Sequence, residues 1–334
     1  GGMVGLAIGT GTIDSVSATG NVVRDIKYRR IGDNVLGLPP NVTASGGLIG
    51  TGIGIDVPLA LATSPIPTQG INITNSHASG LINNTFQAPG QDASISGGLL
   101  GMMLGEGALT NVYATGAVTN DSDDTLDSYV EPAPGTPEDA DFSGVAWVFS
   151  DQTKIKTHIS GGLIGAALGA SPTYYLSLTS QKTPGLTIYG AHASGATKGL
   201  IAGGLIGLSE LKTSINKTYA EGTVHGTLAG GFIGVSGVAS NATPIAGGFG
   251  ENILNQIYPI NDANIDVYQS VSPIEIRNTY TTITIEATPL RVRAQGQSTD
   301  PNYKYLKFDP FDFPAIAGGY IGVTAAPGGV IENS

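Results

Sequence analysis

The side chains best suited to chemistry in this chain are carboxylates, and they gather in two places. The first group is Asp121, Asp123, Asp124 and Asp127, in a stretch rich in acidic residues, proline and glycine. Carboxylate oxygens are the ligands that Ca²⁺ prefers, so these four residues form the candidate calcium site, and no other cofactor is expected. The stretch lacks the glycine and closing glutamate of an EF-hand loop, and a solvated acidic loop explains the same residues.

The second group is the pair Asp309 and Asp312, which alternates with Phe308, Phe311 and Phe313. Two carboxylates about 5 to 10 Å apart are the machinery of glycoside hydrolysis. Neither His nor Arg lies beside this pair in the sequence, and the aromatic rings suit contact with a glycan or a partner equally well. They could also cover the end of a hydrophobic core. The sequence therefore predicts no enzyme activity and a binding role for these five residues.

Two of the four histidines, His77 and His192, share the local sequence HASG. If they lay on adjacent strands, they could pinch a metal ion between them. However, Tyr113 takes the corresponding position in the related sequence YATG that lies between them. We therefore expect at least one strand to separate the two histidines, and we expect a structural or surface role for them.

The elements that position these residues are copies of a repeated unit. Each copy begins with a sequence like GGLIG, and the full copies continue through a glycine-rich spacer into I-x-N-x-Y-A-T-G-x-V. A single unit of this kind cannot bury its own apolar side chains, but stacked units can. The sequence predicts an all-β fold, a right-handed parallel β-helix forming a single domain over residues 1–334. The copies begin at Gly1, Gly46, Gly97, Gly161, Gly203, Gly230 and Gly318.

Two columns of the aligned copies are informative. Asn tolerates the left-handed backbone of a tight corner and can bond to the Asn of the next copy. We expect an asparagine ladder that is interrupted at Gly190 and Lys217. The Asn column reads Ser15, Asn75, Asn111, Gly190, Lys217 and Asn278. The Tyr column reads Ser17, His77, Tyr113, His192, Tyr219 and Tyr280.

Insertions separate the copies at about residues 119–160, 235–275 and 286–317. Irregular loops on a rigid scaffold often carry binding, so recognition is expected there. The sequence also begins and ends within a copy, and we expect the chain to be a fragment of a longer array. Unpaired strands at the end of a β-helix can pair with another copy, so end-to-end self-association is an expected contact.

Composition narrows the classes of partner. The chain has a formal net charge of −11 and 12% charged residues, and it contains no Cys. Disulfides and Cys-based metal sites are therefore excluded. Nucleic acids need clustered cations, so no nucleic-acid partner is expected. The apolar runs are too short and too often broken by glycine to span a bilayer, so no membrane insertion is expected.

The repeated pattern G-G-[LMF]-[VI]-G followed by I-x-N-x-Y-A-T-G-x-V resembles the GLUG motif. This motif occurs in large secreted bacterial proteins, including surface adhesins similar to filamentous haemagglutinin. The resemblance implies an extracellular or cell-surface protein and identifies no ligand. From it we expect a non-enzymatic adhesin or stalk segment that mediates attachment or matrix assembly and binds a glycan or a cell-surface receptor. The alternatives are a self-assembling extracellular filament subunit and a β-helix enzyme that degrades polysaccharides. The copies that match best span residues 1–22, 97–118 and 203–224.

Overall fold

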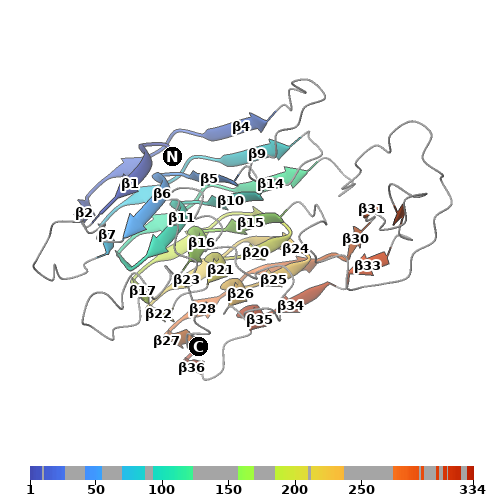
Figure 1. Cartoon of the computed structure of the whole chain (residues 1–334). Helices are drawn as coiled ribbons and strands as arrows, with labels where there is room; N and C mark the ends of the chain where they lie inside the picture. The colour runs from blue at the N-terminus through green and yellow to red at the C-terminus, as the bar shows by residue number, and fades with distance from the viewer. Residues whose placement is uncertain are drawn as a thin grey trace, which may run out of the picture.

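A computed structural model gives the fold of the chain, which consists of β-strands in every part that the structure describes (Figure 1). The described residues form no helix long and apolar enough to cross a membrane. The described residues are 1–9, 11–26, 42–54, 70–86, 93–122, 157–168, 185–209, 212–236, 274–292, 295–296, 306–307, 311–313, 315–324 and 329–334.

Five parallel sheets, named A to E below, account for most of the strands. Sheet A contains β1 (Val4–Ile8), β6 (Ile49–Gly54), β11 (Leu100–Gly105), β16 (Ile164–Leu168), β21 (Ile206–Ser209), β26 (Ile233–Ser236) and β35 (Ile321–Thr324). Sheet B contains β2 (Gly11–Asp14), β7 (Ile71–Thr74), β12 (Gly107–Thr110), β17 (Gly185–Tyr189), β22 (Lys212–Asn216), β27 (Ile274–Arg277) and β36 (Val330–Glu332). Sheet C contains β3 (Ser17–Ala18), β8 (His77–Ala78), β13 (Tyr113–Ala114), β18 (His192–Ser194), β23 (Tyr219–Glu221) and β28 (Tyr280–Thr281).

The two remaining parallel sheets have six strands each. Sheet D contains β4 (Val22–Ile26), β9 (Ile82–Phe86), β14 (Val118–Ser122), β19 (Thr197–Lys198), β24 (Thr223–Gly226) and β29 (Thr284–Ala287). Sheet E contains β5 (Val42–Gly46), β10 (Ala93–Gly97), β15 (Thr157–Gly161), β20 (Ile201–Gly203), β25 (Leu228–Gly230) and β34 (Ile316–Gly318). Two antiparallel pairs join β30 (Leu290–Val292) to β33 (Phe311–Phe313) and β31 (Gln295–Gly296) to β32 (Leu306–Lys307).

The chain visits the sheets in the order E, A, B, C, D and then returns to E, which confirms the predicted parallel β-helix. We number the turns by this order. Turn 1 is β1–β4, turns 2 to 6 are β5–β9, β10–β14, β15–β19, β20–β24 and β25–β29, and turn 7 is β34–β36. Neighbouring strands pair without slipping, so the starting glycine of each copy lies beside that of the next, as from Gly46 to Gly97 and Gly161.

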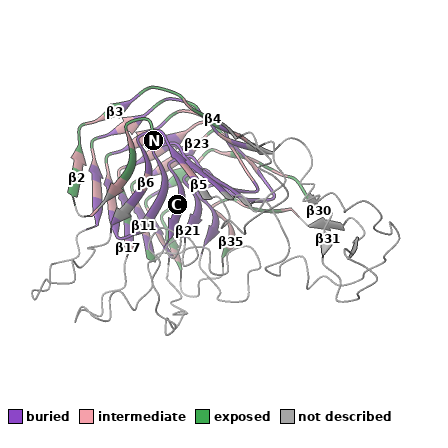
Figure 2. Ribbon diagram, turned by 45° about the horizontal axis from the view of Figure 1, so that its top comes forward, coloured by how far each residue is buried: buried purple, intermediate pink, exposed green. Residues whose placement is uncertain are grey.

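The main core lies between sheets A, B and C and is made of stacked aliphatic columns (Figure 2). In sheet B, Ile73 pairs with Ile13 on one side and with Leu109 on the other, and the column continues as isoleucine. Alternate residues of β7 and β12 are buried, as a sheet with one solvated face requires. Because each turn places an aliphatic residue on the same spot, the apolar surface of one turn is covered by the next.

The glycine pair at the corner between sheets E and A permits successive turns to approach each other closely. A Cβ atom on Gly98 would lie 2.1 Å from the carbonyl oxygen of Gly162 and 2.7 Å from Cβ of Ala114. The equivalent glycines, Gly47 and Gly162, meet the same two kinds of atom. The repeated GG therefore exists because any side chain at its second position would strike the backbone of the next turn.

Sheets D and E pack against each other as a thin arm, and in turns 2 to 4 its interior is polar. The Asn84 side chain donates to Ser96 Oγ at 2.6 Å and to Asn120 Oδ1 at 3.0 Å. Asn120 in turn donates to the carbonyl oxygen of Ile159 and to Ser160 Oγ, both at 2.9 Å. Asn84 is fully buried and Asn120 almost so, and these hydrogen bonds offset the cost of removing the amides from water.

Further along the same arm the interior becomes apolar. Ala202, Val224 and Ala229 form a small buried cluster there, against which Ile283 and Ile285 pack. The column that holds Ser45, Ser96 and Ser160 continues as alanine from Ala202 onward. The arm thus changes from a hydrogen-bonded interior to a packed one between turns 4 and 5.

The polar part of the arm predicts a contrast between two neighbouring asparagines. Asn84→Ala removes the donor shared by Ser94, Ser96 and Asn120 and leaves buried polar groups unsatisfied. We expect it to lower the free energy of unfolding by about 2 to 4 kcal/mol. Asn83→Ala changes the exposed face of the same strand, β9, and is expected to cost less than about 0.5 kcal/mol. Urea unfolding followed by circular dichroism measures both, and equal losses would contradict the assignment.

The glycine corner gives a second test. Gly98→Ala places a Cβ against the carbonyl of Gly162, and overpacking of this kind costs about 1 to 3 kcal/mol. Gly20→Ala is the control, because nothing lies within 4 Å of a Cβ built there. Thermal unfolding should show a lower melting temperature for Gly98→Ala alone. A Gly98→Ala protein as stable as the control would show that the corner relaxes freely.

Candidate functional site

The corner between sheets B and C holds a residue with left-handed backbone in every turn. Only glycine adopts this conformation without strain, and asparagine tolerates it better than most other residues. The six aligned positions of the predicted Asn column all have positive φ, as does Asn333 in turn 7. The φ values are 57° at Ser15, 49° at Asn75, 53° at Asn111, 63° at Gly190, 51° at Lys217, 52° at Asn278 and 52° at Asn333.

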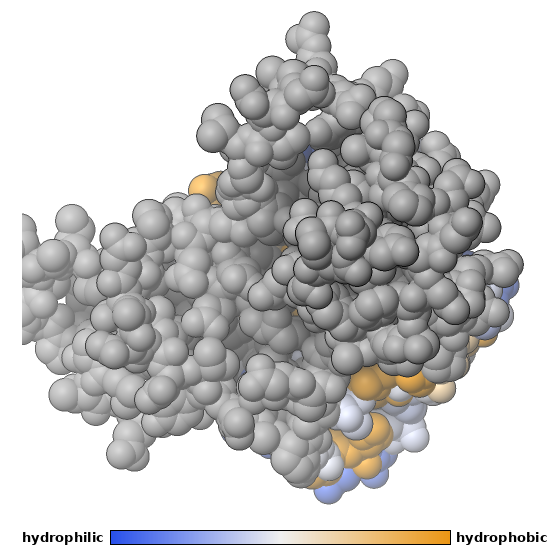
Figure 3. All heavy atoms as spheres, turned by 45° about the vertical axis from the view of Figure 1, so that its right-hand side comes forward, coloured by the Kyte–Doolittle hydropathy of each residue, from blue (hydrophilic) through white to orange (hydrophobic). Residues whose placement is uncertain are grey.

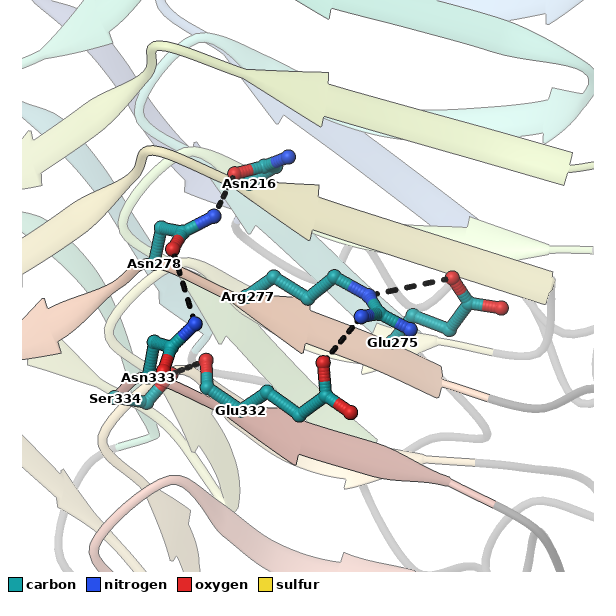
Figure 4. A network of polar contacts seen from close by, with 7 residues as sticks. All are labelled: Asn216, Glu275, Arg277, Asn278, Glu332, Asn333 and Ser334. Atoms are coloured by element: carbon teal, nitrogen blue, oxygen red, sulfur yellow. Dashed lines mark hydrogen bonds and ion pairs between the residues drawn. The ribbon is translucent and has the colours of Figure 1, made fainter.

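The asparagine ladder along this corner is interrupted, as predicted. Asn111 Nδ2 donates a hydrogen bond to Asn75 Oδ1 at 3.4 Å. The row of hydrogen bonds between side-chain amides then stops, because Gly190 and Lys217 occupy the next two positions. It resumes where Asn333 Nδ2 donates to Asn278 Oδ1 at 3.5 Å (Figure 4). Because Lys217 has no side-chain amide, Asn278 Nδ2 donates instead to Oδ1 of the preceding residue of that turn, Asn216, at 3.0 Å.

Beside this corner, the Tyr column forms an aromatic ladder on the outer side of sheet C. Its members are one ring from each of turns 2 to 6, and successive rings are stacked with interplanar angles of 2° to 6°. Tyr113 lies between His77 and His192, which confirms that a strand separates the histidines. The centroid distances are 4.5 Å for His77–Tyr113, 4.8 Å for Tyr113–His192, 4.6 Å for His192–Tyr219 and 5.1 Å for Tyr219–Tyr280.

The aromatic ladder is partly exposed to solvent. The ladder rings are half-buried, and Tyr280 is 51% exposed. Within the described part of the chain, no hydrogen bond joins the tyrosine hydroxyls or the imidazole nitrogens of the ladder to another residue. The ring faces are occupied by one another, so the ladder offers its edges to a ligand.

The surface around the ladder is uncharged over turns 2 to 4. Residues 71–80, 107–116 and 185–197 contain no Asp, Glu, Lys or Arg. We call the outward-facing residues of these three segments the neutral face. They are Asn72, Thr74, Asn75, His77 and Ser79 of turn 2, Ala108, Thr110, Asn111, Tyr113 and Thr115 of turn 3, and Thr187, Tyr189, Gly190, His192 and Ser194 of turn 4. In a chain with a net charge of −11, a polar and aromatic surface without charge is a distinct chemical region.

Charged residues border the neutral face at both ends. At one end, Asp14 accepts hydrogen bonds from Thr74 at 2.5 Å and Asn75 at 2.9 Å. These hydrogen bonds hold the pKa of the Asp14 carboxyl below its ordinary value, Thr74 having the largest effect. At the other end, turn 5 carries Glu221 and Lys217, and the Lys217 ammonium lies 5.2 Å from the centre of the Tyr189 ring. One turn further along the axis, Arg277 pairs with Glu332 and lies 3.9 Å from Glu275 (Figure 4).

Burial changes the titration of two ladder residues. Removal from water lowers the pKa of His192, although the nearby Glu221 carboxylate acts in the opposite direction. Burial, then Tyr280 and Glu221, raise the pKa of Tyr219. Both effects favour the uncharged forms of His192 and Tyr219, so the Tyr219 hydroxyl keeps its proton and can donate a hydrogen bond.

The structure gives partial information on the carboxylates singled out in the sequence. Asp121 belongs to β14, where its backbone pairs with Thr85 of β9. Asp123, Asp124 and Asp127 lie outside the described residues. In the described part, no group of three or more His, Asp or Glu side chains is arranged to hold a metal ion. The calcium site therefore stays a prediction.

The second predicted group lies partly in an antiparallel pair that follows turn 6. Phe311, Asp312 and Phe313 form β33, and its register places Asp312 opposite Arg291 of β30. Phe308 and Asp309 lie outside the described residues. A binding role for these residues also stays a prediction.

The sequence identified the ladder column but not the neutral face around it. Tyr189 had no place in the aligned columns, yet it is 37% exposed on sheet B, and Lys217 Nζ lies 5.2 Å from its ring centre. The neutral face could have been found from the lack of charged residues in three successive copies. That signal identifies a surface only when the three copies are known to lie side by side. In the coloured part of the face in Figure 3, apolar and polar residues lie side by side.

The lowered pKa of His192 predicts a dependence of stability on pH. As the pH falls below the ordinary histidine value of about 6.5, the unfolded chain takes up a proton before the folded chain does. The free energy of unfolding must therefore decrease. His192→Phe keeps a ring in the stack and removes the titration, so the variant should lose less stability between pH 7.5 and pH 5.0. Urea unfolding at the two pH values tests this, and identical losses would contradict it.

The fold and the candidate site are described from the structure of this chain alone. In comparisons with known proteins, no family model matches the chain, and no curated protein or solved structure gives a significant match.

Proposed function

We propose that this chain is a non-enzymatic adhesin or stalk segment of an extracellular or cell-surface protein, which mediates attachment by binding glycans or a cell-surface receptor. The observation that carries the proposal is that sheet A and sheet B each contain one strand from every one of the seven turns, and that each strand pairs with the strand of the next turn. Backbone hydrogen bonds then run along the whole axis of the β-helix, so the scaffold resists bending and stretching. A rigid scaffold of this kind suits the transmission of force and the display of a binding surface.

Chemistry on the surface supports binding rather than catalysis. The ladder presents aligned hydroxyl and imidazole groups, and the residues around it supply threonine, serine and asparagine side chains. Side chains of this kind hydrogen-bond to neutral hydroxyl-rich ligands without the desolvation cost of a charge. The resemblance to GLUG-motif proteins points to the same class of function.

Binding should therefore be measurable without turnover. The full chain, incubated with a panel of insoluble polysaccharides and with whole cells, is expected to be retained on at least one of them and to release no reducing sugar. The double substitution Asp309→Ala and Asp312→Ala removes the carboxylate pair that a hydrolase would need, and neither protein is expected to release reducing sugar because these carboxylates serve no catalytic step in this proposal. Pull-down and reducing-end assays on both proteins give the result.

Other outcomes identify the alternatives. Cleavage of a polysaccharide that the double substitution abolishes would establish the enzyme and overturn the proposal. Long fibres of the purified chain in electron micrographs, without retention on any surface, would instead support a self-assembling filament subunit. Retention that requires Ca²⁺ and is lost on chelation would support the metal site predicted at Asp121, Asp123, Asp124 and Asp127.

A further inference from the structure

The aromatic ladder leaves a specific set of hydrogen-bonding groups unused. The hydroxyls of Tyr113 and Tyr219 and the ring nitrogens of His77 and His192 have no partner among the described residues. Polar groups at a half-buried surface can bind a ligand at a small entropic cost when their side chains are already held in place. Here the stacking on both sides of Tyr113, His192 and Tyr219 holds the rings.

The spacing of these groups selects the shape of the ligand. One polar group occurs per turn, and the rings that carry them are 4.5 to 5.1 Å apart along the axis of the β-helix. A small molecule would touch one or two of these groups. An extended polymer lying along the axis would touch one in each successive turn, and its affinity would rise with the number of turns it covers.

Charge selects the chemical class. The neutral face carries no charged side chain, and carboxylates lie at or near both ends, at Asp14 and Glu221. An anionic polymer would find no cation among the residues of the neutral face and would meet the carboxylates of Asp14 and Glu221 at its borders. The nearest ammonium, that of Lys217 in turn 5, already lies over the ring of Tyr189. A cationic polymer would be drawn to acidic regions elsewhere on the chain. A polymer with hydroxyl groups and no charge matches the threonine, asparagine, tyrosine and imidazole groups that are present.

We propose that the aromatic ladder and the neutral face bind a single uncharged, linear polysaccharide chain, oriented along the axis of the β-helix, through the edges of the ladder rings. This site deepens the proposed attachment function and rests on it. The hydroxyls of Tyr113 and Tyr219 and the imidazoles of His77 and His192 form the central hydrogen bonds, and Asn75, Asn111 and Thr110 line the side toward sheet B.

The test removes hydroxyls and keeps the rings. Tyr113→Phe with Tyr219→Phe leaves the stacked ladder in place, so the fold is expected to survive. The matched control is Thr119→Val with Thr223→Val, which removes two hydroxyls in the same turns, 3 and 5, from the outer side of sheet D. Binding of the full chain to soluble neutral oligosaccharides of increasing length is measured by calorimetry, with uncharged β-linked glucans and a charged polyuronate as probes.

We expect affinity for the neutral oligosaccharides to increase with length and the polyuronate to bind at least tenfold more weakly. The Tyr113→Phe, Tyr219→Phe protein should bind about tenfold more weakly or worse, and the control should bind like the unchanged chain.

Three results would overturn this site. Binding that is unaffected by the tyrosine substitutions, but lost on Phe308→Ala, Phe311→Ala and Phe313→Ala together, would move the glycan site to the second predicted group and leave the attachment function intact. Retention on cells without binding to any neutral oligosaccharide would point to a protein receptor, whereas no retention on any surface would remove the attachment function itself.

Discussion

The structure depends on a backbone hydrogen bond at one corner, repeated turn after turn. At the corner between sheets B and C, the N–H of the left-handed residue in each of turns 1 to 6 donates to a carbonyl of the following turn, as Asn75 does to Thr110 at 3.0 Å and Gly190 to Asn216 at 3.1 Å. The bond is made whether the residue is Asn, Ser, Gly or Lys, because it needs the conformation and not the side chain. A corner fixed in this way aligns sheet B before it and sheet C after it. The stacked aliphatic columns and the aromatic ladder are both consequences of that alignment.

The fold was predictable from the sequence because the repeated glycines and isoleucines each occupy one structural position. The glycine pair marks the close corner, and the Asn and Tyr columns mark the left-handed corner and the ladder, so aligning the copies was equivalent to stacking the turns. The polar interior of the arm was not predictable in the same way. Asn84 and Asn120 look like ordinary strand residues, and their partners Ser94 and Ser96 belong to a different sheet that only the fold brings opposite.

The candidate site was partly predictable for the same reason. The ladder follows from one column of the alignment, but the neutral face is a property of neighbouring turns taken together, and no single copy reveals it. The reach of Asn278 to Asn216 is also a product of context, because the corner residue Lys217 offers no amide and its side chain extends over Tyr189. Where a residue departs from the repeat, its contacts therefore cannot be predicted from the aligned copies and are known only from the structure.

The change of interior along the arm between sheets D and E has a consequence for how such an array can grow. Repeat proteins are commonly lengthened by duplication of a unit, which succeeds when a copied unit meets neighbours like its own. A copy of turn 3 placed between turns 5 and 6 would set Asn120 beside Gly226 and against Ala229, which stands in the column where Ser160 receives the Asn120 amide. Turns on either side of this change are therefore not interchangeable. A duplicated turn is therefore expected to be tolerated only on its own side of the change between turns 4 and 5, where the interior of the arm is of the same kind.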